Sequence, residues 1–275
     1  MEKSEIGALL KKYGLRPRKG LGQNFLAGPE ILQKIVDAAG VGPGDVVLEV
    51  GPGLGGLTLA LAAAARRVVA VEIDRELFGP LEEVLSGAEN VRLVQADILA
   101  VDPRELIDAD EPYLVVANIP YYITSAIFRH LLENAHPPRR LVLTVQKEVA
   151  ARICAAPPDM NLLGLSVGVY GRPETVLRIP AGAFYPPPKV DSSVVRVDLH
   201  AEPRFPPETR ELFFRLVRAG FSQKRKTLRN SLSAGMAWSK ERAEEVLAAA
   251  GIDPMRRAET LDFDEWGKIL EIVGG

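Results

Sequence analysis

Val46-Val47-Leu48-Glu49-Val50-Gly51-Pro52-Gly53-Leu54-Gly55-Gly56 joins an apolar, β-branched run to a glycine-rich loop. An apolar segment suited to a helix follows at Leu57–Ala65. Glycines allow the chain to turn sharply and let a ligand approach the backbone, while the next helix N-terminus offers unpaired N–H groups. Gly51, Gly53 and Gly56 fit the spacing G-x-G-x-x-G. This spacing alone does not separate a ligand site from a simple packing turn.

Four more runs of the same kind follow along the chain. They are Val68–Val71, Val91–Val94, Tyr113–Ala117 and Leu141–Val145. Near-continuous hydrophobicity is typical of strands that are buried on both faces of a parallel sheet. Helices are predicted at Ser125–Leu132 and Gln146–Ala155, so the pattern predicts an α/β fold with an open, Rossmann-like sheet. The later runs Leu165–Tyr170 and Ser193–Leu199 are expected to add antiparallel edge strands.

The C-terminal part of the chain has a different pattern. Residues 201–208 are rich in proline and charge and are typical of a linker. Four short amphipathic helices are predicted after it, at Glu211–Ala219, Arg225–Leu232, Lys240–Ala250 and Asp262–Val273. We therefore expect a large, Rossmann-like α/β domain with a basic N-terminal segment over residues 1–200, and a small helical domain over residues 201–275.

Composition excludes several classes of protein. The chain has 275 residues, of which 47% are hydrophobic and 25% charged, which is typical of globular proteins. Its longest apolar stretch, residues 59–65, is far shorter than the ~20 residues of a membrane span. One cysteine and three scattered histidines argue against a disulfide or a zinc site. We therefore expect a cytoplasmic protein without a bound metal. We also expect a monomer, because the pattern shows no additional apolar helix that would need to be buried against a second chain.

Positive charge is concentrated in two stretches, although the formal net charge is −2. Five basic residues and no acid lie between Lys11 and Lys19, and six basic residues and no acid lie between Arg215 and Arg229. Clustered positive charge on a mildly acidic chain is consistent with an anion-binding face. Two solvated helix faces would give the same pattern.

Two acids at successive strand ends point to a bound adenosine. Glu72 ends the second apolar run and Asp97 follows the third. Ligands of such sheets bind beyond the carboxyl ends of the strands. A carboxylate at Glu72 can accept hydrogen bonds from both ribose hydroxyls, and one at Asp97 can accept from the adenine amino group while Ile98 packs on the ring.

The residues at the end of the fourth strand distinguish between two candidate cofactors, a nicotinamide dinucleotide and S-adenosylmethionine. It ends in Asn118-Ile119-Pro120-Tyr121, and Asn-x-Pro-Tyr resembles the signature of methyltransferases that act on planar exocyclic amines. The side-chain oxygen of Asn118 and the carbonyl of Ile119 can both accept from such an amine, which favours a more nucleophilic nitrogen as the reaction proceeds. Tyr121 can stack on the target base.

By its motifs the whole chain resembles the bacterial small-subunit ribosomal RNA adenine dimethyltransferases, the family linked to kasugamycin sensitivity. The matching blocks, in order, are 22–26, 49–55, 118–121, 146–150, 184–192 and 221–228. The resemblance implies dimethylation of two adjacent adenosines near the 3′ end of small-subunit (16S) RNA, with S-adenosylmethionine as cofactor. It also implies that the substrate is an assembling small subunit, which the two basic stretches would grip through its phosphates.

The resemblance also implies roles for individual residues. Asn24 and Leu26 would close over the methionine end of the cofactor, and Gly51 would lie under it together with Gly53 of the same loop. Glu72 would bind the ribose, Asp97 the adenine, and Asn118 would face both the cofactor and the target amine. Phe184 would stack on the flipped adenine opposite Tyr121.

Three other functions share parts of this pattern. A large-subunit ribosomal RNA methyltransferase that confers macrolide resistance would share the cofactor site and Asn-x-Pro-Tyr. The 184–192 and 223–228 blocks favour the small-subunit enzyme. A non-catalytic RNA-binding assembly factor is disfavoured by the intact Glu72, Asp97 and Asn118. The hypothesis of a nicotinamide-dependent oxidoreductase rests only on the G-x-G-x-x-G pattern. The sequence offers no obvious acid/base pair for hydride chemistry.

Overall fold

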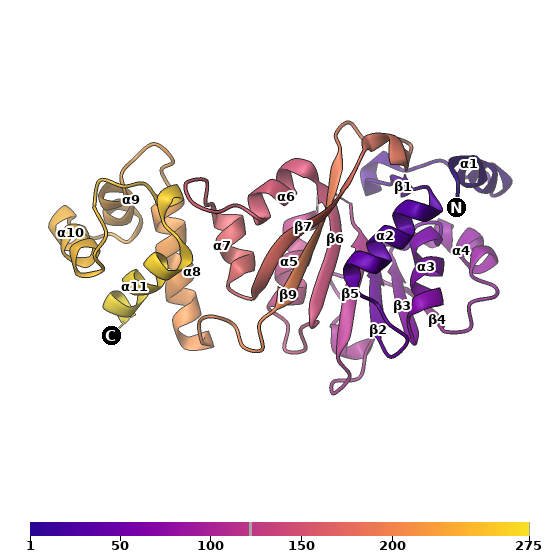
Figure 1. The fold of residues 1–275 in the computed structure, drawn as a ribbon, viewed down its shortest axis with the longest axis horizontal. Coiled ribbons are helices and arrows are strands. Elements are labelled where there is room, and N and C mark those ends of the chain that lie inside the picture. Colours follow the sequence, from indigo (N-terminus) through magenta and orange to yellow (C-terminus); the bar gives the residue numbers. More distant parts are fainter. Residues whose placement is uncertain (121–122, 275) are drawn as a thin grey trace. The chain divides into compact units, whose positions relative to one another are not determined.

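The chain folds into two compact units in the computed structural model, which describes residues 1–120 and 123–274 (Figure 1). The first unit consists of residues 1–150 and 172–199, and the second of residues 151–171 and 200–275. The sequence placed residues 151–171 in the first domain. They join the helical unit because the chain leaves the sheet after its fifth parallel strand and returns to it only at residue 171.

A seven-stranded sheet forms the centre of the first unit, in the order β4-β3-β2-β5-β6-β9-β7. The strands are β2 (Val46–Val50), β3 (Arg67–Glu72), β4 (Val91–Gln95), β5 (Tyr113–Asn118), β6 (Arg140–Gln146), β7 (Gly171–Ile179) and β9 (Ser192–Leu199). β4, β3, β2, β5 and β6 pair in parallel, and β9 pairs antiparallel to β6. All five residues of β2 are buried. The predicted α/β class and its five parallel strands are confirmed.

Strand order reverses between β2 and β5. From β2 the chain passes through α3 (Gly56–Ala64) to β3 on one side, whereas α5 (Thr124–Leu132) leads from β5 to β6 on the other side. Right-handed crossovers in opposite directions place α3 and α5 on opposite faces of the sheet. α2 (Pro29–Ala39) packs beside α3, as Figure 1 shows.

One of the two expected edge strands is a helix. Leu165–Tyr170 was predicted as a strand, but Leu162–Gly168 forms the helix α7. The side chain of Asn161 caps this helix by accepting hydrogen bonds from the backbone N–H groups of Leu163 and Gly164, both at 3.1 Å. Short apolar runs do not distinguish a buried helix from a strand by pattern alone. The antiparallel strand expected at Ser193–Leu199 is confirmed as β9, although it lies inside the sheet and β7 forms the edge.

The N-terminal segment completes the first unit. α1 (Lys3–Lys12) buries Ile6 and Leu10 in a cluster with residues of the glycine loop and of α4 (Phe78–Val84). A two-stranded sheet then joins β1 (Phe25–Leu26) to β8 (Phe184–Tyr185), so that residues far apart in sequence are paired. The pattern analysis predicted neither α1, α2 nor this small sheet.

The second unit is helical, as expected. Its C-terminal helices are α8 (Pro207–Phe221), α9 (Leu228–Gly235), α10 (Lys240–Ala249) and α11 (Phe263–Gly274). α6 (Lys147–Ile153) follows β6 and leads into this unit. Trp266 of α11 is fully buried against Gly220 of α8, where a Cβ would lie 2.4 Å from its ring. The absence of a side chain at Gly220 therefore lets α8 and α11 approach each other closely.

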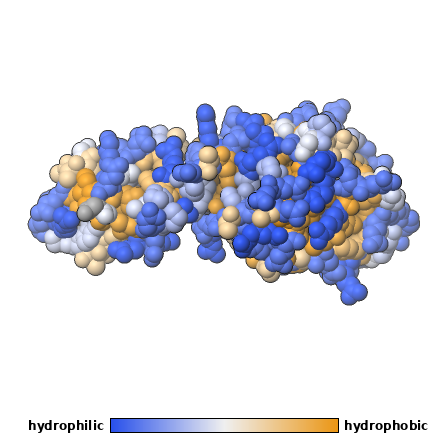
Figure 2. All heavy atoms as spheres, turned by 90° about the horizontal axis from the view of Figure 1, so that it is seen from below, coloured by the Kyte–Doolittle hydropathy of each residue, from blue (hydrophilic) through white to orange (hydrophobic). Residues whose placement is uncertain are grey.

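Hydrophilic residues cover much of the face shown in Figure 2, with hydrophobic atoms in patches between them. Scattered apolar surface of this kind is normal for a globular chain. Within residues 1–120 and 123–274, none of the helices has the length and apolar character that crossing a membrane requires.

Gly235→Ala is expected to destabilise the helical unit. A Cβ at position 235 would lie 2.5 Å from the Cβ and 2.6 Å from the Cα of Ala219, so α8 and α9 would have to separate. Overpacking of this kind costs about 1–3 kcal/mol. We expect the free energy of unfolding, measured by urea denaturation with circular dichroism, to fall by about that amount.

Gly267→Ala is the matched control, since it makes the same change in another helix of the same unit. A Cβ there would lie 3.8 Å from the nearest atom, in the ring of Phe205, which is ordinary van der Waals contact. Alanine is favoured over glycine inside a helix by about 1 kcal/mol. Stability should therefore stay the same or rise, and equal losses in both variants would contradict the close-packing argument.

Candidate functional site

A cavity of about 250 Å³ lies at the carboxyl ends of the central strands of the first unit. Its walls come from residues 21–26, the glycine loop, the end of β3, the loop after β4 and the end of β5. The sequence predicted a cofactor site from seven residues, and the structure places all of them in this lining. They are Asn24, Leu26, Gly51, Gly53, Glu72, Asp97 and Asn118. What each one binds stays a prediction.

The glycine loop holds a backbone that other residues rarely adopt. Gly51 and Gly53 have φ angles of +67° and +61°, in the left-handed region where a side chain is strained. A Cβ on Gly53 would also lie 3.0 Å from the ring of Phe25. The N–H of Gly51 donates to the carbonyl of Val71 at 2.9 Å, which fixes the loop to the end of β3.

Glu72 is held in place by backbone donors. Its side chain is buried, with 5% of the residue exposed. Oε1 accepts from the N–H of Asp74 at 2.8 Å, and Oε2 accepts from the N–H of Gly53 at 3.2 Å. Burial raises the pKa of Glu72, and these two hydrogen bonds partly oppose that effect. The carboxyl group is therefore oriented before any ligand arrives.

Glu49 is a second buried acid in the lining, which the pattern analysis did not select. It is 1% exposed, and its Oε2 has no hydrogen-bond partner among the described atoms. Burial, with a smaller contribution from repulsion by Glu72, raises the pKa of Glu49 to about 8, and the Thr58 hydroxyl opposes this in part. The available signal was an acid inside a run of strand residues that is otherwise wholly apolar.

The loop after β4 presents Asp97 and Ile98 to the cavity. Asp97 is exposed, and its Oδ1 accepts from the N–H of Leu99 at 3.0 Å, whereas Ile98 is buried. An acid and an apolar side chain thus line the same wall, as the adenine prediction requires.

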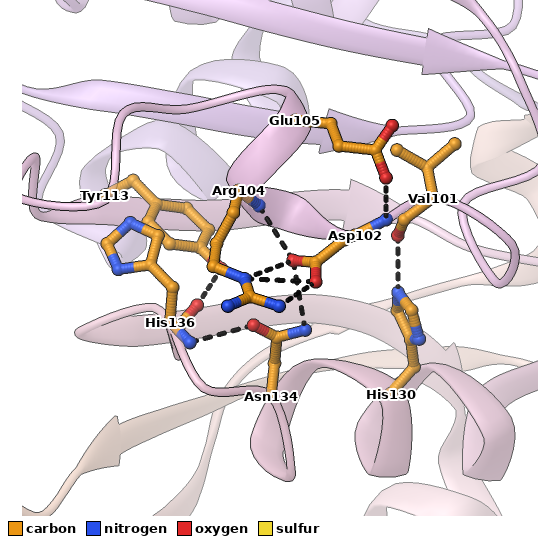
Figure 3. A network of polar contacts seen from close by, with 8 residues as sticks. All are labelled: Val101, Asp102, Arg104, Glu105, Tyr113, His130, Asn134 and His136. Atoms are coloured by element: carbon orange, nitrogen blue, oxygen red, sulfur yellow. Dashed lines mark hydrogen bonds and ion pairs between the residues drawn. The ribbon is translucent and has the colours of Figure 1, made fainter.

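Polar contacts anchor the continuation of this loop to α5 (Figure 3). His130 of α5 has its Nε2 3.0 Å from the carbonyl oxygen of Val101, and the side chain of Asn134 reaches Asp102 at 3.5 Å. Hydrogen bonds and charge from Arg104 hold the pKa of Asp102 well below its usual range. The loop after β4 and the segment of α5 are thereby fixed to each other.

Asn118 lies at the end of β5 and links it to the N-terminal segment. Its Nδ2 donates to the carbonyl of Asn24 at 3.1 Å, and the Nδ2 of Asn24 donates to the carbonyl of Gly22 at 3.0 Å. Ile119 and Pro120 also line the cavity. Tyr121, the remaining member of the motif, lies outside the described residues.

Phe184 is not brought into the cavity lining. It is 1% exposed and packs in the core cluster, directly opposite Leu26 in the β1–β8 pair. Its predicted stacking on a target base stays a prediction, and it requires that side chain to become accessible. In this structure Phe184 supports the strand that carries Leu26.

Ion pairs occupy part of the N-terminal basic stretch. Lys12 pairs with Glu83 at 2.6 Å, and Arg18 pairs with Asp74 at 3.0 Å and with Glu76. These pairs attach the end of α1 to α4, and the segment after α1 to the residues that follow β3. Lys11, Arg16 and Lys19 are exposed.

In the second stretch, Arg229 pairs with Glu244. The other five basic residues are exposed, namely Arg215, Arg218, Lys224, Arg225 and Lys226. The second stretch therefore keeps more of its charge available for an anion than the first.

The family model for ribosomal RNA adenine dimethylases matches residues 14–273. The chain belongs to this family. The dimethylase is 48% identical to a protein named ribosomal RNA small subunit methyltransferase A from Dehalococcoides mccartyi (strain CBDB1), over 97% of this chain and 92% of that protein. It is also 48% identical to the protein of the same name from Moorella thermoacetica, over 95% and 94% of the two chains.

Solved structures share the fold of the dimethylase. The 23S rRNA methyltransferase ErmE is 30% identical, with a TM-score of 0.75 and coverage of 92% of this chain and 100% of that one. A dimethyladenosine transferase from Plasmodium falciparum is 27% identical, with a TM-score of 0.74 and coverage of 91% and 98%. These matches include both the sheet and the C-terminal helices.

Glu49→Gln is expected to stabilise the ligand-free dimethylase at neutral to alkaline pH. Glu49 has a pKa of about 8 in the folded protein and about 4.3 in the unfolded chain. The contribution of protonated Glu49 to the stability of the wild type is therefore complete below about pH 4.3 and is lost as the pH rises toward about 8. Glutamine does not ionise. We expect an unfolding free energy at pH 8 that is higher by an amount on the order of 3 kcal/mol.

Urea denaturation of both proteins between pH 5 and pH 8 checks this expectation. The stability of Glu49→Gln should vary less with pH than that of the wild type. Glu89→Gln, which changes an exposed carboxylate, is the control and should follow the wild-type curve. Parallel curves for Glu49→Gln and the wild type would show that Glu49 is already ionised in the folded protein.

Proposed function

We propose that this dimethylase transfers methyl groups from S-adenosylmethionine to the N6 amines of two adjacent adenosines near the 3′ end of small-subunit ribosomal RNA. Identity of 48% to proteins named for the small subunit, against 30% to a 23S methyltransferase, supports the small-subunit substrate. The cytoplasm, where ribosomes assemble, is the compartment in which this reaction is expected, and a monomer suffices for it.

The charge of the cavity is the observation that favours S-adenosylmethionine over NAD as the cofactor. Three carboxyl groups line it, from Glu49, Glu72 and Asp97, whereas among the described lining residues the one cationic group is the N-terminal ammonium of Met1. A site of this kind attracts cations and disfavours the pyrophosphate of a dinucleotide. S-adenosylmethionine carries a sulfonium and an ammonium group, so the donor set fits it better than NAD.

Different lining residues are assigned to the ribose, the adenine and the methionine end of that cofactor. Glu72, oriented by the N–H groups of Gly53 and Asp74, would accept from the ribose hydroxyls. Asp97 and Ile98 would hold the adenine. Asn24, Leu26, Gly51 and Gly53 would enclose the methionine end.

Asn118 is the residue we assign to the target amine. Its Nδ2 is engaged by the carbonyl of Asn24, which leaves the amide oxygen to accept from an amino group. The carbonyl of Ile119 can accept the second N–H, and together they favour a pyramidal nitrogen whose lone pair can attack. The bound cofactor supplies an electrophilic methyl group. The amine loses its proton after attack, so no strong base is required, and Tyr121 and Phe184 are proposed to stack on the base.

The exposed basic loop between α8 and α9 is proposed to contact RNA phosphates. Lys224, Arg225 and Lys226 lie in it, next to the turn in which Lys226 N–H donates to the carbonyl of Gln223 at 2.9 Å. Phosphate contacts of this kind would make binding strongly dependent on salt.

Methyl transfer from labelled S-adenosylmethionine to unmethylated small subunits tests the proposal, with the modified nucleoside identified by mass. Dimethyladenosine near the RNA 3′ end is the expected product. Transfer to large subunits instead would favour the large-subunit alternative. Tight binding to small subunits without any transfer would identify an assembly factor that has lost the chemistry.

Asn118→Ala should abolish most transfer, since it removes one of the two acceptors for the amine. Loss of one such transition-state contact lowers the rate by about 10²–10³-fold. Initial rates with saturating cofactor measure the effect, and the urea midpoint should stay near that of the wild type. Gln33→Ala, which removes an amide from the exposed face of α2, is the control. A folded Asn118→Ala enzyme with wild-type rates would rule out this mechanism.

Reversing three charges in the α8–α9 loop should weaken RNA binding more than cofactor binding. The substitutions are Lys224→Glu, Arg225→Glu and Lys226→Glu. Filter binding to small subunits between 50 and 200 mM salt should show at least tenfold weaker affinity and a salt slope smaller by about 2–3.

Lys240→Glu, Arg242→Glu and Lys268→Glu, combined in one protein, are the control. They reverse the same number of exposed charges elsewhere in the helical unit. Equal losses in both triple variants would show a general charge effect rather than contacts made by this loop. Calorimetric binding of S-adenosylhomocysteine should be unchanged in both.

A further inference from the structure

The loop of residues 18–24, which precedes β1, is closed by the side chain of Gln23. The Oε1 of Gln23 accepts from the N–H of Arg18 at 2.8 Å, and the N–H of Gln23 donates to the carbonyl of Arg18 at 3.3 Å. Gly22 permits the turn because its φ angle is +62°, in the left-handed region. Gln23 also belongs to the cavity lining. The proposed cofactor contacts of this segment do not use it.

The other end of the Gln23 side chain is bonded to a buried acid. Its Nε2 donates to Oδ2 of Asp74, just after β3, at 2.7 Å. Asp74 is 4% exposed, and its Oδ1 accepts from Nη1 of Arg18 at 3.0 Å and from the N–H of Glu76 at 3.1 Å. A buried carboxylate depends on such donors. Gln23 and Arg18 therefore fasten the loop to the residues that follow β3.

The same loop presents a carbonyl to Asn118. Asn24 follows Gln23 in the chain, and its carbonyl accepts from Nδ2 of Asn118 at 3.1 Å. A side-chain amide donates only at its nitrogen and accepts at its oxygen. The place of the Asn24 carbonyl therefore decides which end of the Asn118 amide is left for a ligand. A reversed amide would set its NH₂ against the N–H of a target amine, and neither group could accept.

We propose that Gln23 is a positioning residue for methyl transfer and that it acts through the amide of Asn118. The bond from Gln23 to Asp74 fixes the loop. The fixed loop holds the Asn24 carbonyl, which turns the oxygen of Asn118 toward the amine. This inference rests on the proposed function, because it uses the role assigned there to Asn118. In this role Gln23 bonds to Asp74 and Arg18 and not to the reacting atoms.

Exchanging the two functional groups separates the hydrogen bond from the shape of the side chains. Gln23→Glu cannot donate to Asp74, and it brings two carboxylates together. Asp74→Asn leaves one oxygen for the three side-chain and backbone donors that now share two. The double variant, Gln23→Glu with Asp74→Asn, restores one donor opposite one acceptor and keeps the total charge.

Transfer rates to small subunits, with cofactor and subunits both saturating, measure the effect. Each single variant should be slower by about tenfold or more, because a hydrogen bond to a buried charge is lost. The double variant should recover to within about threefold of the wild type. Gln23→Met, which keeps the length of the side chain and adds no charge, should be as slow as Gln23→Glu. The affinity for S-adenosylhomocysteine, measured by calorimetry, should fall less than the rate in every variant.

Gln33→Glu is the matched control. The Nε2 of Gln33 donates to Oδ1 of Asp37 at 2.8 Å on the exposed face of α2, so the same substitution breaks the same kind of contact away from the cavity. Its transfer rate should equal that of the wild type. Urea midpoints of all variants show that the proteins compared are folded.

Combination with Asn118→Ala shows whether Gln23 acts through that amide. Effects of residues that act as one unit are not additive. Without the amide there is nothing to orient, so Gln23→Glu should lower the residual single-turnover rate of Asn118→Ala by less than about twofold. A purely structural role would instead slow Asn118→Ala by the same factor as the wild type.

The failures of the two proposals are distinguishable. Three results would overturn the positioning role and leave the proposed function standing. They are a wild-type rate in folded Gln23→Glu, a folded double variant as slow as the single ones, and the full loss from Gln23→Glu on top of Asn118→Ala. A wild-type rate in Asn118→Ala, or no transfer by the wild type, would overturn the proposed function and this inference with it.

Discussion

The reversal of strand order between β2 and β5 is the constraint on which the site depends. Neighbouring strands on either side connect through crossovers that run in opposite directions along the sheet. Right-handedness then sends α3 and α5 to opposite faces and leaves the carboxyl ends of β2 and β5 uncovered by either helix. The glycine loop and Asn118 both lie at those two ends.

Residues distant in sequence close the remaining side of that opening. The β1–β8 pair holds Leu26 against Phe184, and the carbonyl of Asn24 accepts the amide hydrogen bond of Asn118. Lys12 attaches the N-terminal segment to Glu83 of α4, and Arg18 attaches it to Asp74 just after β3, in both cases through ion pairs. These two basic side chains therefore hold the N-terminal segment in place through ion pairs.

Buried acids make the same cavity a source of instability and of selectivity. Glu72 is compensated by two backbone donors, whereas one oxygen of Glu49 has no partner. Functional sites often retain groups that lower the stability of the empty protein, because a ligand of opposite charge relieves the cost on binding. In the proposed function, acidic residues would recognise the cationic cofactor and exposed basic residues would recognise the anionic nucleic acid.

The sequence by itself determined the strand–helix order, the glycine loop and the acids at strand ends, because burial on both faces requires contiguous apolar runs and a positive φ favours glycine. It also determined the Asn118 motif and the family. Only the tertiary structure decided that Leu162–Gly168 is a helix, that Arg18 is paired, and that Glu49 is buried without a partner. Each of these depends on contacts between segments far apart in the chain, which local pattern does not contain.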